Sequence, residues 1–426
     1  MNRPVPSAAE RPVAPTDWKR EAMQRRIRSR YAAERRFRLL GFGAVLLSAA
    51  FLAFLLITMV GNGIRGFTHA EIRVDIDFPG STLMIDPAAL EGFGAEAALA
   101  GADVAGAVRS EMVAQYGSEG AELLSQGAWL RVREALLDDP SLLGREQSFW
   151  LAASSDIDLA AKSDAPPETE RVHARLAAGD AVRTSFNWDF LTSADATDPS
   201  SVGIWGALKG SLLTMLVTIA LAFPIGVLSA VYLEEYAPRN RWTDMIEVSI
   251  NNLAAVPSII FGLLGLAVFL NFMHLPRSAP LVGGLVLALM TMPVIVIAGR
   301  NAIKSVPPSI RDAALGIGAS RVQVVFHHVL PLALPGILTG TIIGMSRALG
   351  ETAPLLLIGM RAFIASPPGG ITDPASVLPV QIFLWSDEVS RGFVEKTSAA
   401  IIVLLVFLLA MNGLAIYLRN KFERRW

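Results

Sequence analysis

The sequence contains no cysteine among its 426 residues. Disulfide frameworks, thiolate nucleophiles and zinc sites built on cysteine are therefore excluded together. Charge is also scarce, because 18% of the residues are Asp, Glu, Lys or Arg, whereas soluble domains carry about 25%. The formal net charge of −1 gives no overall attraction to nucleic acid. These deficits argue against a soluble or nucleic-acid-binding protein.

Apolar residues make up 52% of the chain, and the mean hydropathy is +0.46. They are concentrated in charge-free runs of about 20 residues, long enough to cross a hydrocarbon core of about 30 Å. A further run carries Arg347 and Glu351 and is interrupted by three prolines. The runs predict an all-α polytopic membrane protein with six transmembrane helices, at residues 39–61, 210–233, 253–273, 278–299, 329–360 and 399–418.

The basic residues indicate how these helices are oriented. Residues 1–38 hold eleven Lys or Arg, and residues 419–426 hold four. By the positive-inside rule, both termini are predicted to be cytoplasmic, which requires an even number of crossings. Six crossings place the basic loop 300–328 inside and the acid-rich segment 62–205 outside. A topology signal that lies on anionic lipid explains the basic N-terminus without any binding of nucleic acid.

The same features divide the chain into predicted parts. Helix 39–61 is longer than the apolar core of a signal peptide (about 7 to 15 residues) and no A-x-A site follows it, so we expect an uncleaved anchor. The other parts are a basic cytoplasmic N-terminus at 1–38, an extracytoplasmic domain at 62–205, a core at 206–418 and a basic cytoplasmic tail at 419–426.

The segment 62–205 has its own secondary-structure signals. Ile72, Val74, Ile76 and Phe78 alternate with polar residues, which predicts a strand. Ala-rich stretches at 87–116 and 120–137 predict helices, and 149–159 predicts a second strand. We expect a small α+β domain. Its sequence displays no metal-ligand cluster and no nucleophile–base motif, and its function is not readable from these patterns.

The cytoplasmic loop between the fourth and fifth helices contains a compact motif. Asp312-Ala313-Ala314 is followed by glycines at 316 and 318 and then by Ala319-Ser320. A helix that ends near Gly316 or Gly318, takes positive φ there and resumes as a second helix would present a knob to a partner protein. The alternative is an ordinary amphipathic loop.

Arg347 and Glu351 lie inside the fifth apolar run. A charge at mid-membrane costs roughly 2.5 to 3.5 kcal/mol, so the pair requires an explanation. The two residues are spaced i, i+4 and close enough to pair. A guanidinium also matches the oxygens of phosphate, and Gly350, Thr352 and Pro354 favour local unwinding, typical of a substrate pathway. A purely structural ion pair is the alternative.

Several motifs together resemble a known family. Residues 347–356, R-A-L-G-E-T-A-P-L-L, are similar to the signature of PstA-type permeases of phosphate ABC importers. The D-A-A loop resembles the EAA coupling loop of such permeases, and the segments 256–263, 335–340 and 378–383 support the likeness. The basic N-terminus (1–38) and the predicted extracytoplasmic domain (62–205, called the outer domain below) resemble an N-terminal extension of some members. The resemblance implies a type I ABC importer permease.

The resemblance also implies partners and roles. The partners would be a second permease in a heterodimer, a dimeric ATP-binding subunit, an extracytoplasmic phosphate-binding protein, inorganic phosphate and membrane lipids, with no nucleic acid. ATP and Mg would be bound by the ATPase subunit, leaving no cofactor, metal or catalytic residue in this chain, which is therefore expected not to be an enzyme. The implied location is the bacterial inner membrane.

The candidate residues follow from the two motifs. Arg347 is the predicted anion contact, Glu351 its counter-charge and Thr352 a further pathway residue. The predicted ATPase-coupling residues are Asp312, Ala313, Ala314, Gly318, Ala319 and Ser320. Two alternatives stay open, namely a permease for another oxyanion such as sulfate or molybdate, and a non-transporting membrane sensor or scaffold.

Overall fold

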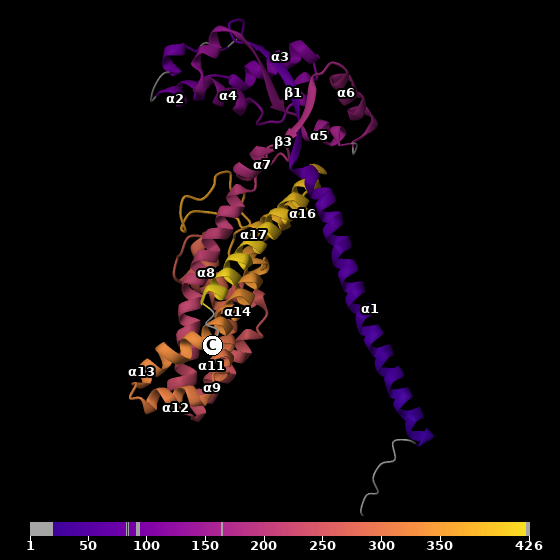
Figure 1. Ribbon diagram of the computed structural model, residues 1–426. Coiled ribbons are helices and arrows are strands. Elements are labelled where there is room, and N and C mark those ends of the chain that lie inside the picture. Colours follow the sequence, from indigo (N-terminus) through magenta and orange to yellow (C-terminus); the bar gives the residue numbers. More distant parts are fainter. Residues whose placement is uncertain (1–19, 82, 84, 91–93, 163–164, 423–426) are drawn as a thin grey trace, which may run out of the picture. The chain divides into compact units, whose positions relative to one another are not determined.

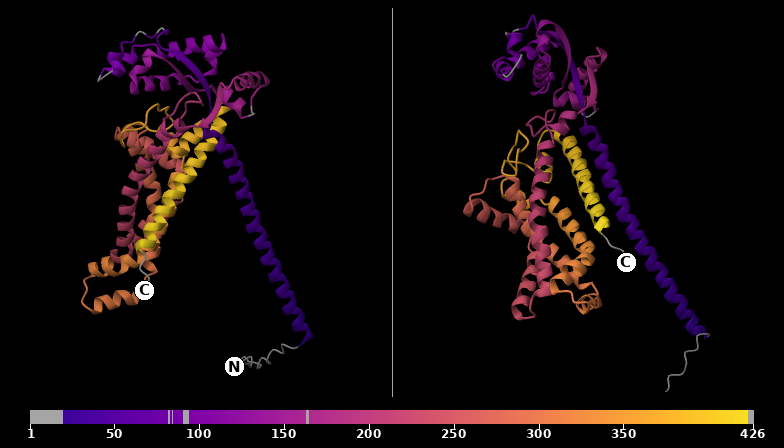
Figure 2. Two further views of the ribbon diagram at one scale, coloured as in Figure 1. Left: turned by 45° about the horizontal axis from the view of Figure 1, so that its top comes forward. Right: turned by 60° about the vertical axis from the view of Figure 1, so that its left-hand side comes forward.

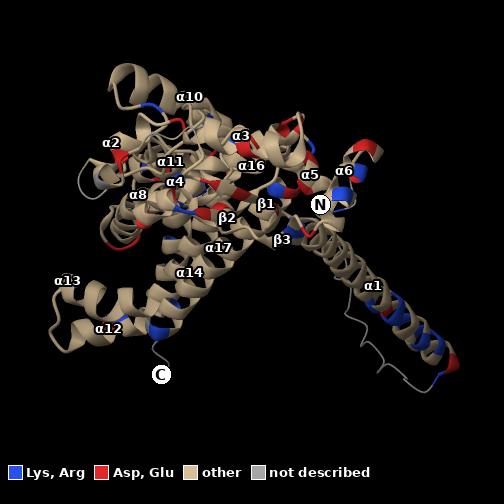
Figure 3. Cartoon of the chain, turned by 90° about the horizontal axis from the view of Figure 1, so that it is seen from above, with Lys and Arg blue, Asp and Glu red and all other residues tan. Residues whose placement is uncertain are grey.

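The computed structural model describes residues 20–422, except 82, 84, 91–93, 163 and 164. Residues 1–19 and 423–426, which include parts of the predicted basic ends, lie outside the described residues. The chain divides into two units, 1–58 and 59–426. The first unit is represented by most of helix α1 (Glu21–Gly66), in which Lys and Arg gather over the first turns and apolar residues follow (Figure 3). The predicted helix 39–61 thus belongs to a longer helix.

The second unit begins with an antiparallel sheet (Figure 1). Strand β1 (Thr68–Asp77) is central, with β2 (Glu146–Ala152) and β3 (Val182–Phe186) on either side. The alternation that predicts a strand is confirmed, because Ile72, Val74 and Ile76 are fully buried. Period-two alternation places them on one face, where they join the hydrophobic core of the outer domain.

Short helices complete the outer domain. They are α2 (Ala95–Ala100), α3 (Val104–Tyr116), α4 (Trp129–Asp138), α5 (Ser155–Ala161), α6 (Pro167–Ala178) and α7 (Trp188–Thr192). Three-residue-per-turn helices cover Pro87–Leu90, Gly120–Leu123 and Pro140–Gly144.

One expectation for this domain is wrong in its second half. The segment 149–159 does not continue as a strand, because β2 ends at Ala152 and α5 begins at Ser155. The fully buried Leu151 pairs with Ile72 of β1. Asp158, on α5, accepts a hydrogen bond from the backbone N–H of Ala70 at 2.8 Å. This tertiary contact favours a turn and a helix over an extended strand.

The remaining helices form the membrane core, shown from two further directions in Figure 2. The long helices are α8 (Trp205–Val231), which continues as a π-helical turn to Tyr236, α11 (Pro280–Lys304), α14 (Leu330–Leu349) and α17 (Gly392–Phe422). Shorter helices are α9 (Arg241–Ala254), α10 (Ser258–Leu264), α12 (Pro308–Gly316), α13 (Arg321–Gln323), α15 (Ala353–Leu357) and α16 (Leu378–Ser386).

The predicted third helix, 253–273, is broken near its start in the structure. Helix α9 ends at Ala254 and α10 begins at Ser258, with an angle of 103° between the pair. Pro257 explains the break, because it lacks an N–H and disfavours helical geometry at Val256. The described residues include five helices long and apolar enough to span a membrane, or six if the bent pair counts as one span.

Helix α14 is packed closely against α11 through a glycine stripe. Gly336, Gly340 and Gly344 follow one another at intervals of four residues, so they share one face. A Cβ atom on Gly340 would lie 2.1 Å from the Cβ of Ala298 on α11. Small residues permit this approach of two backbones in a membrane. On α17, Asn412 Oδ1 accepts a hydrogen bond from Ser346 Oγ of α14 at 2.6 Å.

Two motifs that are distant in the sequence meet in this core. Gly262, in the segment 256–263, is so close to Pro354 that an added Cβ would lie 2.7 Å from the proline Cα. Leu378, at the start of α16, donates its backbone N–H to Ser211 Oγ of α8 at 2.8 Å. The segments that resemble the permease family therefore belong to one packed structure.

Candidate functional site

Arg347 and Glu351 lie at the end of helix α14. Arg347 is in its last turn, the helix ends at Leu349, and Glu351 follows in a non-helical segment. Thr352 is the N-cap residue of the short helix α15. The local unwinding predicted from Gly350 and Pro354 is therefore present, and the helix predicted at 329–360 is shorter in the structure.

The ion pair is loose. Arg347 Nε lies 3.5 Å from Glu351 Oε1, and the two side chains are 51% and 19% exposed. Among the residues that the structure describes, Glu351 is the partner recorded for this guanidinium. A bidentate pair would use two N–H groups at shorter distances. Most of the donor fork of Arg347 is thus available to a second anion.

Arg347 lies on a turn of α14 whose other faces are packed against apolar residues. Its neighbours Ala348 and Leu349 are buried and belong to a hydrophobic cluster that also includes Leu355 and Met345. The guanidinium itself is half-exposed, on the face that does not enter this cluster. A half-exposed guanidinium with one loose partner is suited to bind an anion through its free N–H groups.

The segment predicted to contact the ATPase, residues 308–323 (called the coupling segment below), forms the helix–turn–helix that its sequence predicts. Helix α12 ends at Gly316, and Gly318 has φ of +90°, the left-handed conformation that favours glycine. Ser320 then caps the next helix by a reciprocal capping box with Gln323. The turn is thus fixed by two local signals that are visible in the sequence.

The predicted coupling residues differ in exposure. Asp312 and Ala313 are exposed, as are Gly318 and Ser320, whereas Ala314 is buried in the core and Ala319 is half-buried. Ile317 at the turn is 83% exposed. Sequence reasoning missed this apolar tip, although an isoleucine between two glycines in a loop predicted to be cytoplasmic is a usable signal of a contact surface.

One long helix connects the coupling turn to Arg347. Residues Arg321–Leu349 form a continuous helical segment of 29 residues, made of α13, a π-helical stretch and α14. Arg321 follows the turn directly, and Arg347 lies near the other end. At 1.5 Å per residue the two are separated by about 39 Å along the axis. The turn and Arg347 are therefore joined by one continuous helical segment.

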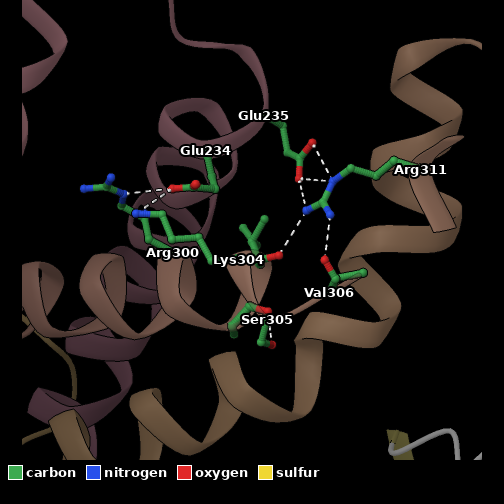
Figure 4. A network of polar contacts seen from close by, with 9 residues as sticks. Glu234, Glu235, Arg300, Lys304, Ser305, Val306 and Arg311 are labelled. Atoms are coloured by element: carbon green, nitrogen blue, oxygen red, sulfur yellow. Dashed lines mark hydrogen bonds and ion pairs between the residues drawn. The ribbon is translucent and has the colours of Figure 1, made fainter. Parts of the chain in front are cut away.

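A second connection leaves the coupling segment through Arg311 (Figure 4). Its Nη2 donates to Glu235 Oε1 at 2.7 Å and to the carbonyl of Ile303 at 3.0 Å, and its Nη1 donates to the carbonyl of Val306 at 2.7 Å. Arg311 precedes Asp312 on α12, Glu235 follows α8, and Ile303 is on α11. One side chain therefore ties the coupling helix to two core helices.

Arg300 makes a similar bridge next to it. Its Nε lies 3.3 Å from Glu234, in the π-helical turn after α8 (Figure 4). Its Nη2 lies 2.8 Å from Glu247 on α9. Lys304 adds a weaker contact of 3.6 Å to Glu234. Sequence reasoning missed these acidic partners. The detectable signal is the adjacent acids at positions 234 and 235, placed on the predicted basic side of the membrane.

A buried ion cluster joins the outer domain to α17. Lys162 Nζ lies 2.8 Å from Asp158 Oδ2 and 2.8 Å from Glu395 Oε2, and it also donates to the carbonyl of Thr68 at 3.1 Å. All three charged side chains are almost fully buried. Breaking a buried pair on one side costs about 3 to 5 kcal/mol. The ion pair between Lys162 and Glu395 therefore holds the outer domain to α17.

A further charged cluster lies on the sheet of the outer domain and is centred on the buried Glu71. Its Oε1 accepts from Arg131 Nη1 at 2.6 Å, and its Oε2 accepts from Arg183 Nε at 2.7 Å. His69 Nε2 lies 3.5 Å from Oε1. Burial of the carboxyl raises the pKa of Glu71, but the three hydrogen bonds outweigh this effect and lower the pKa from 4.5 to about 2.

This cluster makes the outer domain sensitive to acid. The pKa of Glu71 is lower in the folded chain than in the unfolded chain. Its contribution to the free energy of unfolding is therefore complete above pH 4.5 and is lost as the pH falls toward 2. The shift corresponds to roughly 3 kcal/mol. We expect the hydrogen-exchange protection of β1 and β3 to fall as the pH is lowered from 4.5 to about 2. Glu71→Gln should lower this protection already at neutral pH. Unchanged protection in Glu71→Gln would contradict the assignment.

Comparison with known proteins adds family relationships. Residues 222–425 match the family described as "Binding-protein-dependent transport system inner membrane component", and residues 24–171 match a domain of unknown function, DUF3333. The chain is 31% identical over 258 residues to the probable ABC transporter permease protein YqgI of Bacillus subtilis, covering 56% of this chain and 86% of that protein.

Proteins with "Phosphate transport system permease" in their names also match. The PstA protein of Yersinia pestis is 30% identical over 50% of this chain and 71% of its own length. PstA 1 of Mycobacterium tuberculosis is 35% identical over 37% of this chain, and the match spans about half (51%) of that relative. Among solved structures, the inward-facing MetNI methionine ABC transporter matches with a TM-score of 0.40 at 18% identity, covering 52% of this chain and 98% of that chain.

Proposed function

Because this chain belongs to the binding-protein-dependent transport system inner membrane components, and within them to the PstA-type permeases, we propose that it is the membrane subunit of an ATP-driven importer that moves inorganic phosphate inward by alternating access. The observation that carries the proposal is a half-exposed arginine at the end of α14, loosely held by Glu351.

In this proposal, phosphate and Glu351 compete for Arg347. Glu351 holds the guanidinium when the pathway is empty, and phosphate replaces it by charge-assisted hydrogen bonds when it arrives. Exchange of partners avoids a bare cation next to the membrane core, which would be costly. Thr352, at the break before α15, would add a hydroxyl donor. The exposed face of Arg347 suits a pathway that a second permease completes.

The coupling turn would transmit the work of ATP hydrolysis. In permeases of this family, a second permease, an ATPase and a substrate-binding protein complete the transporter. Here we assign the exposed turn with Ile317 at its tip to the ATPase cleft, and the helix Arg321–Leu349 to transmission toward Arg347. ATP and Mg would be held by the dimeric ATPase partner, this chain would provide no hydrolytic site, and the phosphate-binding protein would dock on the extracytoplasmic side.

The chain is a multi-pass inner-membrane protein, and we propose that both of its termini are cytoplasmic. The basic first turns of α1 support this orientation under the positive-inside rule. Counting the bent pair α9–α10 as one crossing gives the even number that the orientation requires.

Substrate competition tests the anion assignment. Uptake of labelled phosphate into vesicles containing the complete transporter is expected to be inhibited by excess unlabelled phosphate and not by sulfate or molybdate. Equal inhibition by sulfate or molybdate would instead support a permease for another oxyanion. The two outcomes depend on the substrate alone, so they leave the coupling assignment untouched.

A second test addresses the non-transporting sensor or scaffold. A permease must bind the ATPase subunit through its coupling turn, whereas a scaffold need not. We expect the ATPase subunit to co-purify with the wild-type chain and to be lost when the exposed Ile317 is replaced by Asp. Retained transport without any bound ATPase would exclude the proposed function.

A further inference from the structure

The outer domain contains a pocket that lies apart from the membrane pathway. Its volume is about 470 Å³. The floor is the polar face of the sheet, where Glu71 pairs with Arg183 and His69 pairs with Ser185 across β1 and β3. Directly paired residues of antiparallel strands project to the same face. The sheet therefore presents charged and hydroxyl groups to one hollow and its apolar residues to the core.

The walls of the pocket add hydrogen-bond donors. One wall is the beginning of α4, whose N-cap residue Ala128 provides no side-chain cap, together with Arg131 in its first turn. The backbone N–H groups of Ala128, Leu130 and Arg131 already bond carbonyl oxygens three residues earlier, so the donor that this wall offers is the guanidinium of Arg131. Ser200, Ser201 and Trp188 also line the pocket, and Ser201 Oγ lies 2.6 Å from Ser125 Oγ, just before α4.

Three polar atoms in this lining are buried and lack a partner among the described residues. They are His69 Nδ1, Ser185 Oγ and Ser200 Oγ. His69 and Ser200 are only 4% and 6% exposed. An unsatisfied buried polar atom costs about 1 to 3 kcal/mol, so three around one hollow require an explanation. A bound polar molecule would provide the missing partners.

The charges in the lining indicate the chemistry of that molecule. Glu71 is occupied by two guanidinium groups, and each of these retains N–H groups that are not used on Glu71. The other two acids, Glu134 and Asp189, are exposed. The cluster around Glu71 thus contains two half-exposed guanidiniums for one buried carboxylate, a local excess of one positive charge and of hydrogen-bond donors. A small oxyanion accepts from such donors without needing a donor of its own.

We propose that this pocket of the outer domain is a binding site for a phosphate-type oxyanion, either free phosphate or the headgroup of a phospholipid. Arg131 and Arg183, fixed by Glu71, provide charge-assisted hydrogen bonds, and the hydroxyls of Ser185 and Ser200 complete the ligand shell. The site goes beyond the proposed transport function, since it contains no residue of the membrane core.

The orphaned hydroxyls offer a discriminating test. Removing a hydroxyl that has no partner should not destabilise the free chain, whereas it removes a contact to the ligand. The variant is Ser185→Ala combined with Ser200→Ala in the full-length chain, purified in detergent and delipidated. The matched control is Ser376→Ala, which removes a buried unpartnered hydroxyl outside the pocket. The readout is the unfolding temperature as a function of inorganic phosphate, with chloride as the ionic-strength control.

We expect the wild type and Ser376→Ala to be stabilised by phosphate. The double variant should have the same unfolding temperature without phosphate and need about tenfold more phosphate for the same shift, which corresponds to about 1.4 kcal/mol. A second arm uses phosphatidylcholine nanodiscs with or without phosphatidylglycerol. Stabilisation by phosphatidylglycerol alone, weakened in the double variant, would identify a headgroup site.

Two results would overturn the inference. One is that neither phosphate nor phosphatidylglycerol stabilises the chain. The other is that the double variant responds as Ser376→Ala does, because any phosphate binding would then lie elsewhere, including the membrane pathway. The test measures binding and not uptake, so a failed transport assignment would leave its outcome unaffected.

Discussion

Arg347→Gln is expected to abolish phosphate uptake, with a loss of at least about a hundredfold. Glutamine retains a polar group at the end of α14 but removes the positive charge and the guanidinium fork. Hydrogen bonds to charged groups contribute roughly 1.5 to 3 kcal/mol each, so losing two of them is sufficient for this effect. Uptake should be measured in vesicles with the complete transporter, under saturating ATP.

The controls separate substrate binding from folding. Arg347→Lys keeps the charge and loses the planar fork, so uptake should be intermediate. Arg361→Gln removes an exposed arginine that follows α15, and it should leave uptake unchanged. All three variants should assemble normally, because Arg347 is half-exposed and only loosely paired. Unimpaired uptake in Arg347→Gln would eliminate the anion-contact role and favour a structural ion pair.

Arg311→Gln is expected to uncouple ATP hydrolysis from transport. This change removes the ion pair with Glu235 and leaves that carboxylate mostly buried without its partner. Breaking such a pair costs about 3 kcal/mol, and the cost falls on the junction of α12 with α8 and α11. We expect more than about tenfold lower uptake, while the ATPase subunit remains bound through the exposed turn. The measurement is phosphate transported per ATP hydrolysed.

A double variant distinguishes coupling from simple damage. Arg311→Gln combined with Glu235→Gln leaves no unpaired charge, so assembly should recover relative to the single variant. Coupling should remain low, because the link between α12 and α8 is still weakened. Arg239→Gln, an exposed arginine between α8 and α9, is the matched control. A normal ratio of transport to hydrolysis in Arg311→Gln would refute the link.

Local sequence signals predicted the parts of the site that depend on local structure. The apolar runs indicated α8, α11, α14 and α17, because membrane helices need length and low charge. The turn at Gly318 follows from the freedom of glycine, and its second helix is capped by Ser320. Arg347 was conspicuous because a charge in an apolar run is rare.

Contacts between distant segments could not be predicted in the same way. Lys162 pairs with Glu395, 233 positions away, and Arg311 pairs with Glu235, 76 positions away. Nothing in the periodicity of either partner specifies the other. Strand β3 was missed for a related reason, since its five residues are held in place by pairing with β1. The pocket of the outer domain depends on both features.

The central claim, that this chain conducts phosphate under the control of an ATPase, is tested most directly by transport in reconstituted vesicles. The vesicles contain the second permease and the ATPase subunit, with phosphate-binding protein outside and ATP inside, and are prepared with or without this chain. The account predicts phosphate accumulation that requires this chain, ATP and the binding protein together. Equal accumulation in vesicles lacking this chain would contradict it.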